Sequence, residues 1–248
     1  MQRYFLEVAY KGTNYSGFQV QKNANTVQAE MEKALRILFS QAFNLTGSSR
    51  TDSGVHALQN FFHFDTDVQI EQKHLYNLNA ILPADISANS IYPVKDDCHC
   101  RFDAVSREYK YFVYRKKDPF LTNSAYYYPY SVDMDILRTA AEIITEYEDF
   151  TSFSKRNTQV KTFICNIFYS EWSSEASCIV YTVKANRFLR GMVRGLVSTM
   201  LKAARGIVSI DGFREIIENK DCRYADFAAP PHALYLAKVN YNDGLVQA

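Results

Sequence analysis

The sequence predicts an α+β protein whose two halves share or abut a mainly antiparallel sheet. Segments that alternate polar and apolar residues, as strands do, recur along the whole chain. Segments with apolar residues at helical spacing lie between them in each half. The composition is that of a folded protein, since 47% of the 248 residues are hydrophobic and 22% are charged. A chain of this length can bury a substantial core.

The first half opens with a predicted strand over 3–10, followed by a glycine-bearing loop. A helix is predicted to begin at Asn25 or Thr26, because both side chains are good N-caps and apolar residues at helical spacing follow them. The remaining predicted elements of this half are strands over 43–47 and 58–66, a helix over 71–82 that ends at Pro83, and extended segments after it.

The second half repeats this rhythm without sequence identity to the first, so any repeat is one of shape only. Its predicted elements are an extended segment over 102–115, a helix near 133–144, strands near 161–172 and 178–185, a helix over 188–204 and a last strand near 234–241.

Cysteine usage and hydropathy bear on the compartment. The five cysteines show no regular spacing, which is unlike a disulfide framework and favours a reducing compartment. Neither a signal peptide nor a run of about 20 apolar residues is evident, so we expect a soluble, cytoplasmic protein. Cys98, His99 and Cys100 suggest zinc, but no second cysteine pair lies nearby in the sequence, so we expect no metal there.

The charge distribution leaves a nucleic-acid partner open. The net charge is only +1, so the total charge does not by itself indicate such a partner. The content of 18 Tyr and 17 Phe is high, and tyrosine suits base stacking as well as packing. Local basic groups include residues 115–117 and a set that consists of Lys184, Arg187, Arg190, Arg194, Lys202 and Arg205.

The stretch "GSSRTDSGVHA" at 47–57 places three chemically capable side chains in a sharp turn. These are Arg50, Asp52 and His56. A lone aspartate in a loop is most often a turn-former that binds its own backbone, so this stretch alone does not identify a site.

One face of the predicted helix over 188–204 carries several arginines, so its charge is of one sign. A solvated charged face is the usual explanation. However, two glycines inside the predicted helix suggest that something approaches its backbone closely, and an anionic partner such as RNA fits both features. The arginines of this predicted stripe are Arg187, Arg190, Arg194 and Arg205, and the glycines are Gly191 and Gly195.

The predicted strand within 102–115 alternates charged residues with tyrosines. Arg107, Tyr109 and Tyr111 share one face, which is suited to stacking and phosphate binding. A half-buried strand with a polar edge is an equally good interpretation.

Taken together, these stretches resemble the tRNA pseudouridine synthase A family. "SRTDSGVHA" is similar to its catalytic-loop pattern G-R-T-D-[AS]-G-V-H-A. Similar blocks follow the family order across most of the chain: "YKGTNYSGFQVQ", "TVQAEMEKAL", "LNAILPADI", "HCRFDAVSREYKY", "EDFTSF", "NRFLRGMVRGLV" and "APPHALYL".

The resemblance implies an RNA isomerase that converts uridine to pseudouridine at positions 38, 39 and 40 of the tRNA anticodon stem-loop. It implies two ferredoxin-like halves, residues 1–100 and 101–248, that form a continuous mainly antiparallel sheet with the active site in the central cleft. It also implies a homodimer that needs neither cofactor nor metal.

Carried over position by position, the resemblance makes Asp52 the catalytic carboxylate, Tyr109 the tyrosine that stacks on the target base, and Arg194 the partner of Asp52. The residues that would place or bind the RNA are Arg50, His56, Arg107, Arg187 and Arg190.

Three departures from the family pattern put loop geometry and substrate choice in question, because Ser49, Ser198 and Ala233 stand where glycine is usual. Two alternatives stay open. One is an RNA-binding protein without activity, or a paralogue that modifies another RNA. The other is a carboxylate hydrolase such as a glycosidase, for which Asp65 or Asp67 would have to supply a second acid. Whether Asp52 attacks the base or the sugar, or acts through a glycal, also stays open.

Overall fold

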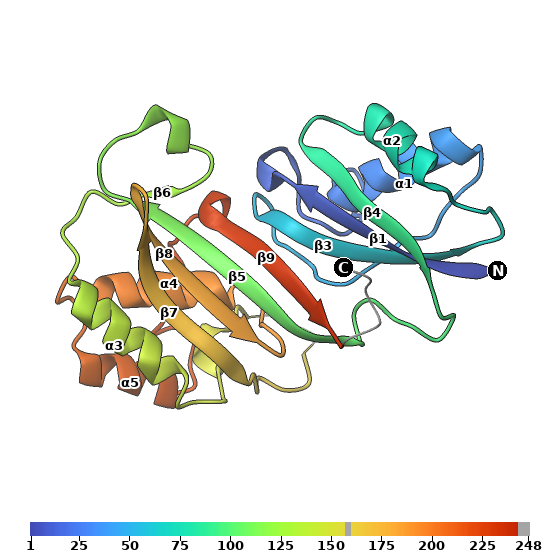
Figure 1. Ribbon diagram of the computed structural model, residues 1–248. Coiled ribbons are helices and arrows are strands. Elements are labelled where there is room, and N and C mark those ends of the chain that lie inside the picture. Colours follow the sequence, from blue (N-terminus) through green and yellow to red (C-terminus); the bar gives the residue numbers. More distant parts are fainter. Residues whose placement is uncertain (157–159, 243–248) are drawn as a thin grey trace. The chain divides into compact units, whose positions relative to one another are not determined.

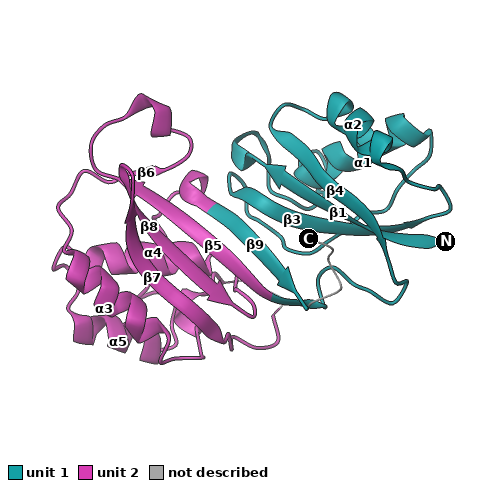
Figure 2. Ribbon diagram, in the orientation of Figure 1, with its two compact units in different colours: residues 1–105, 235–248 teal, residues 106–234 magenta. Residues whose placement is uncertain are grey.

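The computed structural model describes residues 1–156 and 160–242 and confirms the predicted α+β class (Figure 1). The described residues contain five α-helices and nine strands, and most strand pairs are antiparallel. The chain divides into two compact units (Figure 2). Unit 1 contains residues 1–105 and the segment from Tyr235 onward, and unit 2 contains residues 106–234. These units differ from the expected halves in that the last strand groups with the first half.

Unit 1 follows the β-α-β-β-α-β order of a ferredoxin-like fold. Strand β1 lies between β4 and β3 and is antiparallel to both. Strand β3 pairs with the short antiparallel β2 and, at its start, with the parallel β9. Figure 1 shows α1 and α2 side by side on one face of this sheet. The elements are β1 (Gln2–Tyr10), α1 (Val27–Phe39), β2 (Thr46–Gly47), β3 (His56–Thr66), α2 (Gln72–Ile81), β4 (Ile86–Val94) and β9 (Leu234–Tyr241).

The helices of unit 1 begin where the sequence predicts. Thr26 is the N-cap of α1, and its side-chain oxygen accepts a hydrogen bond from the Ala29 N–H. Glu71 and His74 form a reciprocal capping box at the start of α2. The two helices and the sheet enclose a core of aromatic and aliphatic side chains that includes Leu6, Met31, Phe62 and Phe64. Phe5 and Phe61 are buried on the opposite face of the sheet, where both rings contact the ring of Tyr241.

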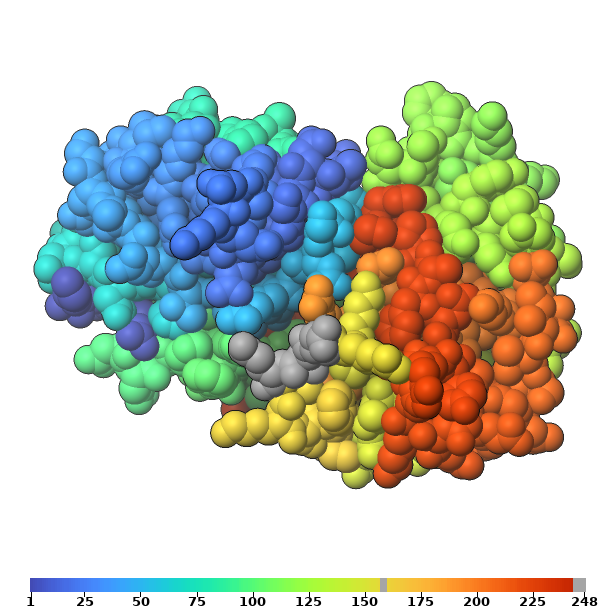
Figure 3. Space-filling model, turned by 180° about the vertical axis from the view of Figure 1, so that it is seen from behind, coloured from blue at the N-terminus to red at the C-terminus, as the bar shows by residue number. Residues whose placement is uncertain are grey.

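Unit 2 runs β-β-α-β-β-α-α, and β8 lies between β5 and β7, antiparallel to both. Helix α3 contacts β7, α4 and α5. Figure 3 shows the orange and red segments that follow residue 205 at the surface of this unit. The elements are β5 (Ala104–Tyr114), β6 (Tyr126–Tyr127), α3 (Met134–Ile144), β7 (Ile167–Glu175), β8 (Cys178–Ala185), α4 (Met192–Ala203) and α5 (Ile210–Glu218).

The structure corrects two boundaries and adds a helix in unit 2. The strand predicted from residue 161 begins at Ile167, and the helix predicted from residue 188 begins at Met192. Gly191 has φ 76°, a left-handed conformation that cannot belong to an α-helix, and this sets the later start. Helix α5 was not predicted. None of the helices in the described ranges is long and apolar enough to cross a membrane.

Candidate active site

Residues 48–55, here called the Asp52 loop, connect β2 to β3 in unit 1. The Ser48 N–H donates to a carbonyl of β3 at 2.8 Å, and the Phe18 N–H donates to the Thr51 carbonyl at 3.2 Å. Asp52 is half-buried, so part of the residue keeps access to solvent. The loop is therefore anchored to neighbouring backbone on the N-terminal side of Asp52.

A tight turn follows directly after Asp52. The Val55 N–H donates to the Asp52 carbonyl at 3.1 Å, and Gly54 has φ 79° within this turn. Gly17 lies against the backbone of the loop at Thr51. It has φ 99°, and a Cβ at this position would lie 3.1 Å from the Thr51 carbonyl oxygen. The chain needs glycine at both positions because an L side chain would strain the backbone beside the loop.

The family departures at Ser49, Ser198 and Ala233 lie at positions that do not need glycine for a left-handed backbone, because none of the three residues has positive φ. Ser49 does not have positive φ, so serine carries no left-handed strain there, and its hydroxyl lies 3.2 Å from that of Ser48. Ser198 and Ala233 are both buried.

Arg50 is exposed on the Asp52 loop and borders a groove of about 190 Å³. Arg101 and Phe102 line the same groove, and both side chains are exposed. Sequence reasoning did not nominate these two residues, because they lie about fifty positions from Arg50 and only the fold brings them together. Cations beside an exposed ring suit a phosphate and a base.

His56 lies at the end of the loop and is buried. Its Nδ1 accepts a hydrogen bond from the Gly12 N–H at 3.0 Å, and its ring lies 4.6 Å from the ring of Tyr235. Only 1% of the residue is exposed. In this structure, His56 therefore fixes the end of the loop against neighbouring backbone.

Arg107 and Tyr109 lie on β5 in unit 2. Arg107 donates to the Asn186 carbonyl at 3.1 Å, and the Tyr109 ring meets Phe188 edge-on at 5.0 Å. Tyr111, which shares their strand face in the sequence pattern, is fully buried and donates its hydroxyl hydrogen to the Pro230 carbonyl. Tyr111 is thus a core residue. Tyr109 is also buried, with 9% of the residue exposed, so of this predicted face only Arg107 is half-buried.

Arg194 lies in the first turn of α4 and is half-buried. Its Nε donates to the Ala229 carbonyl at 2.6 Å, and its Nη2 lies 3.5 Å from the Phe227 carbonyl. These contacts use two of the five N–H donors of the guanidinium and fix its plane. Because Asp52 belongs to unit 1 and Tyr109 and Arg194 belong to unit 2, their meeting in one site stays a prediction.

The prediction that four arginines form a stripe on one helix is wrong. Arg187 and Arg190 precede α4, because that helix begins at Met192. Arg205 follows α4, and its guanidinium lies 3.7 Å from the centre of the Tyr130 ring. Arg190 is exposed and Arg187 half-buried, so both stay available to an anionic partner from a loop rather than a helix.

The two glycines of this region have different explanations from the predicted one. Gly191 is the left-handed N-cap of α4. Gly195 lies inside the helix, where a Cβ would come within 2.9 Å of the Phe227 ring. The close approach to the helix at Gly195 is therefore made by the protein's own aromatic side chain.

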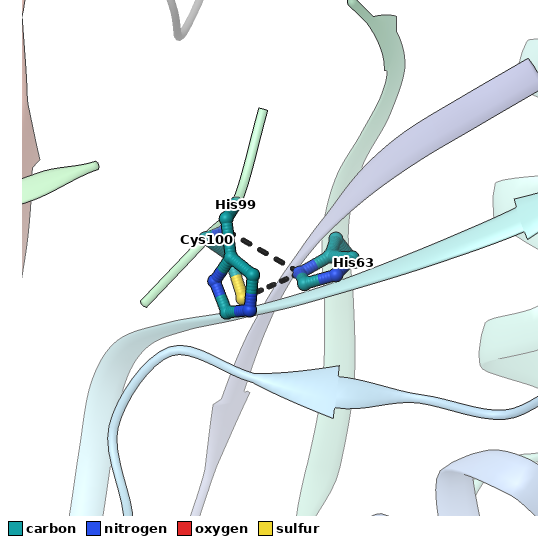
Figure 4. Close-up of side chains that lie close together, drawn as sticks. All are labelled: His63, His99 and Cys100. Carbon is teal, nitrogen blue, oxygen red and sulfur yellow. Dashed lines mark hydrogen bonds between the residues drawn. The ribbon is translucent and has the colours of Figure 1, made fainter. Parts of the chain in front are cut away.

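His63, His99 and Cys100 form a cluster with one ligand atom each within 4.8 Å of one another (Figure 4). His63 Nδ1 accepts from the Cys100 N–H at 3.3 Å and lies 3.1 Å from the Cys100 thiol. His99 Nδ1 accepts from the backbone N–H of Arg101 and of Phe102. A metal ion would have to displace these hydrogen bonds, since zinc needs nitrogen lone pairs and a thiolate. We therefore interpret the cluster as a hydrogen-bonded junction of β3 with the 98–102 segment.

The geometry also weakens the glycosidase alternative. Arg3 donates to both carboxylate oxygens of Asp65 at 2.7 Å, and these hydrogen bonds hold the Asp65 pKa below its ordinary value. Asp65 lies nine residues along β3 from His56, or about 30 Å at the usual rise of a strand. A glycosidase pair needs its carboxylates within about 10 Å and its acid with a raised pKa.

Comparison with known proteins agrees with the motif analysis. A family model described as tRNA pseudouridine synthase matches residues 7–103 and 147–242. The chain is 44% identical over 247 residues to tRNA pseudouridine synthase A of Parabacteroides distasonis, with 99% of this chain and 98% of that protein covered. It is 43% identical to the protein of the same name from Bacteroides thetaiotaomicron, with coverages of 99% and 93%. For the Staphylococcus aureus protein the identity is 37%, with coverages of 96% and 91%.

Proposed function

The chain belongs to the tRNA pseudouridine synthase family, and we propose that it isomerises uridines 38, 39 and 40 of the tRNA anticodon stem-loop with Asp52 as its catalytic carboxylate. Members of this family are isomerases that act on tRNA uridine. The choice of these three positions and the role of Asp52 are the finer part of the proposal.

The reaction exchanges one bond for another within a single nucleotide. The bond between ribose C1′ and uracil N1 breaks, the base rotates, and C1′ joins C5. The hydrogen at C5 leaves as a proton, and N1 takes up a proton. The uridine must first leave its stack, which costs a few kcal/mol. A carboxylate can then attack the base or the sugar, or stabilise charge that develops on the sugar.

The observation that carries the proposal is the setting of Asp52. The residues that precede it are anchored by backbone hydrogen bonds, a tight turn follows it, and its own side chain is half-buried. A catalytic group needs such a fixed backbone with access to the substrate. An ordinary turn aspartate requires only its own backbone as a partner.

The other site residues complete the proposal. Tyr109 would hold the extruded base, and the N–H donors of Arg194 not used by Ala229 and Phe227 would pair with the Asp52 carboxylate. Arg50, Arg107, Arg187 and Arg190 would contact RNA, with His56 holding the end of the Asp52 loop. We further propose that the protein is a homodimer in the cytoplasm, where its five free cysteines would stay reduced.

Tritium release from tRNA that carries 5-tritiated uridine tests this function, because closure of the C1′–C5 bond expels that hydrogen. We expect release from the wild type and a loss of at least about 1000-fold in Asp52→Ala and Asp52→Asn. Asp67→Asn removes an exposed carboxylate outside the loop and serves as the matched control. Filter binding should show that Asp52→Asn still binds tRNA.

Substrate choice is read from the same assay with tRNAs in which uridines 38, 39 and 40 are replaced one at a time. Binding without release from any tRNA would favour the RNA-binding alternative. Release from an RNA other than tRNA would favour the paralogue. Full activity in Asp52→Ala would remove Asp52 from the chemistry.

A further inference from the structure

A buried chain of hydrogen bonds lies beneath the Asp52 loop. Asn60 on β3 is fully buried, and its Nδ2 donates to the Ser49 carbonyl at 2.9 Å and to the Tyr10 hydroxyl at 3.2 Å. The Tyr10 hydroxyl, on β1, lies 2.9 Å from Thr51 Oγ1. The two central strands of unit 1 thus hold the loop through side chains to which neither the motif nor the family resemblance assigns a role.

The direction of each hydrogen bond made by Asn60 is fixed. The Phe61 N–H donates to Asn60 Oδ1 at 2.9 Å, which orients the amide so that Nδ2 faces the loop. Because an amide nitrogen only donates, the Tyr10 oxygen accepts from it, and the Tyr10 hydroxyl hydrogen can then be donated to Thr51 Oγ1. Burial raises the Tyr10 pKa to about 12, so this hydrogen is present at neutral pH.

The two ends of this chain of hydrogen bonds hold the residues on either side of Arg50. Asn60 holds the backbone at Ser49, and Tyr10 holds the side chain of Thr51, which directly precedes Asp52. Both contacts are buried, where an unmade hydrogen bond is costly, so they restrict the loop more strongly than exposed contacts would.

We propose that Tyr10 and Asn60 are positioning residues that fix the Ser49–Asp52 segment so that the Asp52 carboxylate meets the substrate. This inference rests on the proposed function of Asp52. Neither residue needs to touch RNA, because each acts through Ser49 or Thr51. Displacement of a catalytic group by about 1 Å can cost about 100-fold in rate, so loosening the loop should lower kcat while leaving tRNA binding intact.

A double-mutant cycle tests the contact between Tyr10 and Thr51. Tyr10→Phe and Thr51→Val each remove one hydroxyl and nearly keep the side-chain shape. Each should lower kcat for tritium release by about 10- to 100-fold with KM for tRNA within about twofold. The double variant should be no slower than the slower single variant, because both substitutions break the same hydrogen bond.

Tyr181→Phe is the matched control. The Tyr181 hydroxyl is also buried and lies 2.9 Å from Ser170 Oγ, but in unit 2 and far along the chain from the loop. It should lower the melting temperature about as much as Tyr10→Phe does, with kcat unchanged. All rates are measured at a temperature at which circular dichroism shows each variant folded.

Asn60→Asp tests the second arm, because the carboxylate keeps the shape of the amide but cannot donate to Ser49 or Tyr10. It should lower kcat at least as much as Tyr10→Phe. The control is Asn79→Asp, since the Asn79 amide bridges the backbone N–H and carbonyl of Ala88 at 2.8 Å outside the loop.

The outcomes separate the two proposals. Unchanged kcat in Tyr10→Phe and Asn60→Asp, an equal fall of kcat in the controls, or additive effects in the cycle would overturn the positioning role while wild-type release still supports the function. No release from the wild type would overturn the proposed function itself, and the positioning role with it.

Discussion

His63 is a buried histidine whose environment favours the neutral ring. Burial, assisted by the charge of neighbouring His99, lowers the His63 pKa to about 4. In the unfolded chain the ring titrates near 6.5, so the unfolded state binds more protons between about pH 4 and 6.5. This group therefore leaves stability unaffected above pH 6.5 and lowers it progressively as the pH falls toward 4.

We expect the free energy of unfolding to fall by up to about 3 kcal/mol between pH 6.5 and 4 on account of His63. Urea denaturation across this range measures the loss. In His63→Asn, whose amide oxygen can still accept from the Cys100 N–H, the loss should be smaller. An NMR titration midpoint of His63 near 6.5 would contradict the prediction.

Only part of the candidate site is encoded locally in the sequence. The motif at 47–57 predicts Asp52 and its turn because all its determinants lie within a few residues. Burial of His56 and the role of Asn60 depend on partners such as Gly12 and Tyr10, some fifty positions away. A single sequence carries no signal for such pairs, because polar residues on a strand look alike whether they face solvent or a loop.

Gly12 lies in the short 3₁₀ turn after β1, where the chain passes close to the Asp52 loop. A Cβ at this position would lie 2.0 Å from the Val55 carbonyl oxygen and 2.7 Å from its carbon. Backbone atoms cannot rotate away, so Gly12→Ala should destabilise the protein by about 1–3 kcal/mol in urea denaturation. It should also slow tritium release, since Val55 closes the turn after Asp52.

The matched control for Gly12→Ala is Gly206→Ala. Gly206 has φ 73° but no atom within 4 Å of an added Cβ, so this substitution carries only backbone strain of about 1–2 kcal/mol and should leave tritium release unchanged. Unchanged tritium release in Gly12→Ala would show that the loop does not need this close approach.

Helix α4 shows which features the periodicity of apolar residues predicts and which it does not. The apolar positions of the predicted helix, such as Leu196 and Met200, are buried as their spacing requires. The same spacing wrongly extended the helix back through Arg190, because periodicity does not register the backbone conformation of Gly191. Helix α5 was missed because it is only nine residues long and carries a glycine in its first turn.

The whole chain is nearly neutral, with 28 basic and 27 acidic side chains. Affinity for tRNA must therefore come from cations whose charge is not locally neutralised. Some basic side chains are neutralised by acidic neighbours. The Lys33 ammonium lies 3.6 Å from Glu30, and the Arg138 guanidinium lies 3.0 Å from Asp135. We therefore expect exposed loop cations such as Arg190 to contribute more to RNA binding than the total charge indicates.

The salt dependence of tRNA binding tests this distribution. Each phosphate contact contributes about 0.7–0.9 to the slope of log K against log salt, because binding releases condensed counterions. If Arg187 and Arg190 each contact a phosphate, the double alanine variant should lower that slope by about 1.4–1.8. The Lys33→Ala, Arg138→Ala double variant removes the same charge from ion-paired positions and should leave the slope nearly unchanged. Equal slopes in both double variants would show that Arg187 and Arg190 belong to an ordinary solvated surface and do not contact phosphate. Arg50 and Arg107 would then be the remaining candidates for RNA contact.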